Sequence, residues 1–265
     1  MINRVFKPIL ELLPENNRWE RIWKLAQVDF QKRYYGNRLG LFWALLNPLF
    51  QLGVYYIVFT NVFSVSIPYF ALYMFIGLLF WMFFSEATTK SIQTLINYRY
   101  LIENIQFNKI DLFLSSTLSS FMGFAFNLAV FFVIALSLGP PVTLNFLYFP
   151  LFVVNIFLLA LAFGLLLSTL NIYLKDIHHV WDMVTLLGIW LAPVFYSEDL
   201  FEKKLGFLMY ANPFAGIIIN VRKTVLYGQA PDFLLCFYNF AFAILLLVLC
   251  NLLFRRFSHK AIEKL

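Results

Sequence analysis

Charged residues are scarce in this sequence. Asp, Glu, Lys and Arg together make up 13% of its 265 residues, whereas hydrophobic residues make up 62%. Soluble domains carry about 25% charged residues and about 45–50% apolar ones, which argues against a free cytosolic enzyme. The mean hydropathy of +0.77 also excludes intrinsic disorder. The chain therefore has the composition of an integral membrane protein.

The residue patterns of common catalytic and metal sites are also missing. None of the eleven glycines is followed by lysine, so the sequence has no phosphate-binding loop of the Gly-Lys-Ser/Thr type. His178 and His179 are adjacent and have no cysteine nearby, which argues against a metal site. Cys236 and Cys250 lie in one apolar run, about 21 Å apart along a helix, too far to pair within it. We therefore expect neither an enzyme nor a bound cofactor or metal.

Long apolar stretches are what the sequence does contain. Six of them qualify, or nearly qualify, as membrane-spanning helices: 39–63, 69–84, 112–138, 144–174, 180–197 and 233–254. Apart from Asp182, at the edge of the fifth, none of them contains Asp, Glu, Lys, Arg or His. Ion-coupled transporters usually carry ionisable residues inside the membrane. Their absence points to an external energy source, and so to a motor on another subunit.

Basic residues are distributed unevenly around these stretches. Sixteen of the 20 Lys and Arg lie in the terminal segments and alternate loops, and four lie in the remaining loops. The positive-inside rule then predicts that both termini are cytoplasmic, which agrees with an even number of spans. The net charge of +6 accordingly indicates membrane orientation and not nucleic-acid binding.

Two further segments are predicted to be helical without crossing the membrane. Residues 18–35 carry apolar side chains at spacings of three and four, which predicts an amphipathic helix in the cytoplasmic interface. A soluble amphipathic helix packed on a partner is the alternative. Residues 205–227 are apolar but contain Asn212-Pro213 and Arg222-Lys223. We expect them to form two short helices that dip into the outer leaflet, because proline breaks a helix and charges at depth are costly.

The predicted fold is thus an all-α integral membrane domain covering residues 1–265. It has six transmembrane helices, an N-terminal interfacial helix, and an outer re-entrant helical pair before the last span.

Four motifs, in this order along the chain, resemble one family. The first, within 29–56, includes Lys32-Arg33-Tyr34, Leu39-Gly40, Trp43 and Pro48; the second is Asn97 with Leu101-Ile102 and Phe107. The third runs from Asn171 to Ile177, and the fourth comprises Pro193 to Tyr196 and then Tyr210 to Pro213. Together they resemble permeases of ABC exporters that move O-antigen, capsule and teichoic acid chains. The prolines typical of the second motif are missing from Phe107-Asn108 and Asp111-Leu112.

This resemblance implies a bacterial inner-membrane homodimer bound to two ATP-binding cassette subunits. It also implies a lipid-linked glycan substrate, with O-antigen foremost. Two alternatives remain: a permease for a smaller amphiphile such as a lipid or drug, and a membrane scaffold that transports nothing.

Three groups of residues are candidates for this function. The coupling region 98–109 is the longest cytoplasmic loop between spans, and a solvated loop is the alternative. Residues of this region and of the third motif are candidates for contact with the ATPase. They are Tyr98, Arg99, Leu101, Ile102, Glu103, Phe107 and Lys109 in the region, and Lys175 and Asp176 in the motif. Arg33 and Arg38 are candidates to hold a lipid pyrophosphate at the cytoplasmic mouth, with plain membrane anchoring as the alternative.

Aromatic side chains form the third group, since their rings can guide sugars by their flat C–H faces. The candidates for lining a channel are Trp43, Tyr55, Tyr56, Trp81, Phe195 and Tyr196. Packing against lipid or within the core is the alternative for each ring.

Overall fold

The structure is a computed structural model that describes residues 17–34, 40, 42–61, 67–104 and 108–262, with only the backbone at 104 and 258–262. Within these residues every regular element is a helix, as predicted. Five helical segments are long and apolar enough to cross a membrane. They are α3 (Phe42–Asn61), α4 (Phe70–Ile92), α7 (Ile110–Leu138), η1 with α8 (Leu144–Tyr148 and Phe149–Tyr173) and α13 (Phe233–Ile262).

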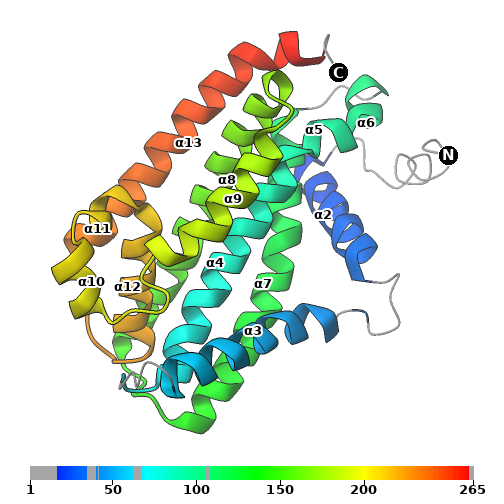
Figure 1. Cartoon of the computed structure of the whole chain (residues 1–265). Coiled ribbons are helices and arrows are strands. Elements are labelled where there is room, and N and C mark those ends of the chain that lie inside the picture. Colours follow the sequence, from blue (N-terminus) through cyan, green and yellow to red (C-terminus); the bar gives the residue numbers. More distant parts are fainter. Residues whose placement is uncertain (1–16, 35–39, 41, 62–66, 105–107, 263–265) are drawn as a thin grey trace.

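Helices α4 and α8 form the centre of the bundle. In the most apolar window of each helix, 78% of the residues of α4 and 61% of those of α8 are buried, compared with 11% for α3. Helix α4 packs against α7, α8 and α3, and α8 packs against α13 (Figure 1). Aromatic rings fill much of this core; for example, the Phe80 and Phe124 rings meet edge to face at 5.2 Å. The apolar side chains of α3 therefore remain available to lipid or to another chain.

Helix α4 is longer than the stretch 69–84 that the sequence predicts. It begins after Tyr69, whose φ of 54° is left-handed, and continues to Ile92. Residues 85–92, predicted to belong to a loop, are therefore two further turns of helix. Glu86 and Lys90 accordingly lie on the end of α4.

The fifth predicted span, 180–197, is not one continuous helix. Helix α9 (Ile177–Gly188) and the short η2 (Ile189–Leu191) are followed by turns. Ala192 adopts an extended conformation with φ −103° and ψ 150°. The cause is local, because a residue that precedes proline is disfavoured in helical conformation and Pro193 comes next.

The segment 205–227 contains the short helices that the sequence predicts. After α10 (Glu198–Leu205) come α11 (Leu208–Ala211) and α12 (Pro213–Val225). Asn212 lies between them in an extended conformation, and its side-chain oxygen accepts a hydrogen bond from the Phe214 N–H at 3.1 Å. An Asn cap followed by proline at the first helical position is a favourable helix start. Helix α12 then packs against α13, α8 and α4.

Arg222 of α12 ties this outer segment to the centre of the bundle. Its buried guanidinium donates to the Tyr73 carbonyl of α4 at 2.8 and 3.1 Å, to the Val194 carbonyl at 2.7 Å, and to the Pro193 carbonyl. It also lies 3.4 Å from the centroid of the Tyr73 ring. The adjacent Lys223 forms an ion pair with Glu198 at 2.7 Å. The two neighbouring charges are thus accommodated in different ways, one by backbone carbonyls and the other by a carboxylate.

Candidate functional site

The first residues of the predicted coupling region 98–109 fold onto the chain itself. Residues of this region form α6 (Arg99–Asn104), which follows α5 (Thr94–Asn97) at one end of the bundle (Figure 1). The buried Tyr98 and Leu101 pack with Leu25 of α2 (Arg18–Tyr34) and Leu112 of α7, and Ile102 is partly buried against them. These apolar side chains therefore contact the chain's own helices.

The polar side of the same region faces outward. Arg99 and Glu103 form an exposed ion pair at 2.7 Å, one turn apart on α6. Lys109 immediately precedes α7, and Phe107 lies outside the described residues. Any partner that docks on α6 meets this charged surface first.

The connection between α8 and α9, which contains the exposed Lys175 and Asp176, lies at the same end of the bundle as α5 and α6 (Figure 1). The side-chain amide of Asn171, near the end of α8, donates to the Ile92 carbonyl at the end of α4, at 3.2 Å. This bond joins the last turn of α8 to the last residue of α4, shortly before α5 begins.

Helix α2, which matches the predicted amphipathic helix, is fastened to the bundle at several points. The Arg18 guanidinium forms a bidentate ion pair with the buried Asp111 at the start of α7, the closest approach being 2.7 Å. Desolvation raises the pKa of Asp29, although a hydrogen bond from Tyr98 opposes the shift. The aromatic side chains Trp19 and Trp23 of α2 are exposed. One face of α2 thus packs on α7 while two tryptophans remain available to a membrane interface.

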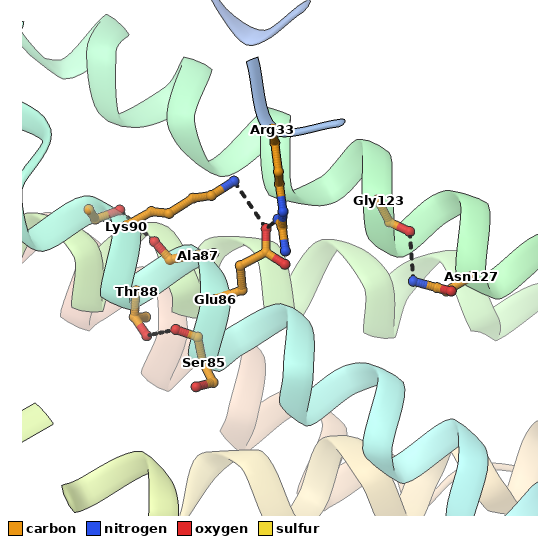
Figure 2. A network of polar contacts seen from close by, with 9 residues as sticks. Arg33, Ser85, Glu86, Ala87, Thr88, Lys90, Gly123 and Asn127 are labelled. Carbon is orange, nitrogen blue, oxygen red and sulfur yellow. Dashed lines mark hydrogen bonds and ion pairs between the residues drawn. The ribbon is translucent and has the colours of Figure 1, made fainter. Parts of the chain in front are cut away.

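Arg33, predicted to hold a lipid phosphate, is engaged by a carboxylate from α4 (Figure 2). Its guanidinium donates to Glu86, and the same Glu86 oxygen lies 3.1 Å from the ammonium of Lys90. Burial acts to lower the pKa of Arg33, but the hydrogen bond and charge of Glu86 outweigh this and raise it. Arg38, the other predicted phosphate ligand, lies outside the described residues.

Glu86 and Lys90 were not predicted, because the apolar stretch ends at Phe84. The signal available in the sequence is their spacing of four residues, which places opposite charges on one face if the helix continues.

Two pockets adjoin this network. The larger, with a cavity volume of about 940 Å³, lies between α2 and the α4–α6 segment and is lined by Lys32, Arg33 and Lys90 among others. The smaller, of about 400 Å³, is lined by Arg33, Glu86 and residues of α3 and α7, Trp43 among them. We call them the basic pocket and the inner pocket. Arg33 lines both.

The predicted channel aromatics separate into distinct places. Tyr55, Phe195 and Tyr196 line a third pocket of about 1120 Å³, near α10, together with Phe59 and Trp190. The Phe195 ring lies 4.8 Å from Tyr55 and is stacked on Phe59 at 5.2 Å. We call this the aromatic pocket.

The remaining aromatics do not line it. Trp43 lines the inner pocket, and Tyr56 is exposed on α3. Trp81 is buried in the core, with its ring 4.9 Å from that of Phe214. The sequence could not separate these environments because aromatic residues are frequent in each.

Comparison with known proteins identifies the family. Residues 20–226 match the model of the ABC-2 type transporters. The chain belongs to the ABC-2 type transporter family. With its five apolar helices it is a multi-pass membrane protein, and it acts in transport as a permease-type subunit.

Several curated members of this family are similar to the chain. The O-antigen export system permease protein RfbA of Klebsiella pneumoniae is 24% identical over 205 residues, which cover 77% of this chain and 79% of the relative. The protein of the same name from Myxococcus xanthus is 26% identical over 210 residues, or 78% and 81% of the two chains. The similarity to an ABC exporter permease inferred from short motifs is thereby confirmed.

Proposed function

We propose that this chain is the membrane-spanning subunit of an ATP-driven exporter that moves a lipid-linked polysaccharide, O-antigen foremost, out of the cytoplasm. The observation that carries the proposal is its similarity, over more than three quarters of its length, to permeases named for O-antigen export. The matched region runs from α2 to α12 and includes the basic and inner pockets and all lining residues of the aromatic pocket except Tyr227 and Gln229.

The proposed arrangement in a bacterial inner membrane has six crossings. Helix α9, η2 and the turns after them make up the fifth crossing, shorter than the others, and α10 to α12 re-enter from the outer side. The surface of α3, with few of its side chains buried, supports pairing with a second copy of the chain. Both termini then lie in the cytoplasm, with α2 in the interface below the membrane.

ATP hydrolysis takes place on two cassette subunits docked at the α5 and α6 end. The exposed Arg99–Glu103 pair on α6 and the exposed Lys175-Asp176 turn supply a polar docking surface. Beneath it, Leu101 is fully buried against α2 and α7, so a push on α6 reaches α2. This packing supports a coupling role for residues 98–109.

The substrate path joins the two ends of the bundle. The basic pocket receives the anionic lipid phosphate with Arg33 as a ligand. The second predicted ligand, Arg38, lies outside the described residues. The aromatic pocket at the other end presents rings for sugar faces and the carboxylates of Glu198 and Asp199 for hydroxyl groups. The polymer passes between these regions along the seam of two copies.

Deletion of the gene, with complementation by the wild-type chain, tests this function. We expect loss of the surface polysaccharide and accumulation of its lipid-linked precursor inside the cell. A matched measurement is co-purification of an ATP-binding cassette subunit with the tagged chain. Intact surface polymer together with altered sensitivity to a drug or altered lipid distribution would favour a smaller amphiphile. Absence of any ATPase from the purified complex would contradict an ABC exporter.

A further inference from the structure

One ion pair connects the linings of the basic pocket and the inner pocket. Arg33 lines both pockets, Lys90 lines the basic one, and Glu86 lines the inner one. The guanidinium of Arg33 on α2 pairs with the carboxylate of Glu86 on α4 (Figure 2). Because Arg33 belongs to both linings, this pair is placed to control passage from one pocket to the other.

The inner pocket is more than a gap between helices. Its wall combines the aromatic Tyr34 and Trp43 with the polar Asn47 and Asn127. The Asn127 amide nitrogen donates to the Gly123 carbonyl at 3.1 Å, whereas its buried oxygen has no hydrogen-bond partner within the described part of the chain. A buried acceptor of this kind is costly unless something donates to it. The inner pocket thus has a wall of mixed aromatic and polar character.

We propose that the Arg33–Glu86 pair is a door between the two pockets, which a lipid-attached phosphate opens by taking Arg33 from Glu86. This inference rests on the proposed export of a lipid-linked substrate and adds the regulation of its access. Guanidinium groups bind carboxylate and phosphate in the same bidentate geometry, so the two anions compete for one site. The lining of this pocket carries more basic side chains than carboxylates, which gives it an excess of positive charge for the phosphate. The basic side chains are Lys32, Arg33, Lys90 and Arg99, and the carboxylates are Asp29 and Glu103.

Lys90 compensates the negative charge of Glu86 when Arg33 leaves. Both side chains of the pair are partly exposed, at 35% for Arg33 and 28% for Glu86, so solvent also screens a charge that loses its partner. Here Lys90 lies one turn from Glu86 on the same helix and is 3.1 Å from it, so the carboxylate keeps a cation after Arg33 leaves. The pair that breaks joins α2 to α4, and the pair that persists lies within α4.

The door is also placed to respond to the coupling region. Helix α2, which carries Arg33, packs through Leu25 against Tyr98 and Leu101. A displacement of α6 by a docked ATPase therefore moves α2 relative to α4 and strains the same ion pair. Phosphate binding and ATPase movement act on one contact.

Binding of lipid phosphate to the full-length chain in nanodiscs tests the proposal. The probes are a fluorescent phosphatidic acid and a polyprenyl phosphate, with phosphatidylcholine as the uncharged reference and inorganic phosphate as competitor. Glu86→Gln removes the competing carboxylate and keeps the side-chain shape. We expect it to bind both lipid phosphates about three-fold more tightly, because the loss of a partly exposed ion pair frees Arg33 at a small cost. Arg33→Gln should abolish that gain.

Glu20→Gln is the matched control, because Glu20 is an exposed carboxylate on α2 that lines neither pocket. An equal gain in this variant would show a general charge effect and overturn the door. If the wild-type chain binds lipid phosphate and Glu86→Gln binds it equally well, the door is also overturned. The proposed export function is not contradicted by that result. Inorganic phosphate that competes as well as the lipids would show a site for free phosphate instead.

If Glu86→Gln does not fold, Glu86→Asp replaces it. Aspartate keeps the charge beside Lys90 but withdraws it from Arg33 by one methylene, so we expect a smaller gain of the same sign. No gain in that variant would count against the door. A wild-type chain that binds neither lipid phosphate, or whose deletion leaves surface polymer intact, would contradict the proposed function itself.

Discussion

The hydrogen bonds of Arg222 predict an unusual order of stability among its substitutions. The side chain is held by three backbone carbonyls and the face of one ring. It connects the turn that contains Pro193 and Val194 to α4, alongside the Tyr73 hydroxyl, which donates to the Tyr196 carbonyl. Substitution by methionine removes the charge and the donors together, whereas substitution by lysine keeps the charge but loses the planar fork that reaches carbonyls on two segments.

The expected magnitudes follow from these contacts. Arg222→Met leaves the Pro193 and Val194 carbonyls without their donors, at about 1–3 kcal/mol each. Relief of the buried charge offsets part of this loss, so we expect a net destabilisation of about 2 kcal/mol. Arg222→Lys retains a charge that is no longer adequately bonded and should cost about 3–5 kcal/mol. For a chain of this size these values correspond to falls of about 6 °C and about 12 °C in the melting temperature.

Thermal unfolding of the purified chain in nanodiscs, followed by tryptophan fluorescence at a fixed scan rate, provides the measurement. Lys223→Met is the control at the adjacent position, because its partly exposed ion pair with Glu198 should contribute less than about 1 kcal/mol. A lysine variant as stable as the wild type would refute the reasoning, since a point charge would then suffice. A methionine variant less stable than the lysine variant would refute it as well.

Three further predictions concern other contacts. Gly216→Ala should lower the melting temperature, because an added Cβ would lie 2.0 Å from the Asn239 amide nitrogen. The control Gly53→Ala should leave the melting temperature unchanged or raise it, because no atom lies within 4 Å of its added Cβ. Asp111→Asn should release α2, detected as faster proteolysis within α2, because it removes the charge partner of Arg18; equal proteolysis rates would contradict this anchoring. The double substitution of Tyr55 and Phe195 by alanine should reduce surface polymer while basal ATPase activity persists; normal polymer would argue against the aromatic pocket as a conduit.

Local signals in the sequence were sufficient to predict that two short segments are helical. The cap at Asn212-Pro213 and the three-and-four spacing of residues 18–35 depend on neighbours along the chain, and both predicted helical features are present. The end of α4 was predicted too early, because the decision relied on hydropathy, and Glu86 lowers hydropathy without ending a helix. The range 180–197 was predicted as one helix although Pro193 interrupts it, because the apolar character outweighed the proline signal.

The sequence by itself determined that this protein lies in a membrane and which family it resembles. Composition and periodicity suffice for this, because the bilayer imposes length and apolarity on every spanning helix. Only the tertiary structure decided that Arg33 is joined to Glu86, that Arg222 is held by carbonyls, and that Tyr55 and Phe195 share a pocket. These contacts join residues from separate helices, and no spacing along the chain specifies which faces meet.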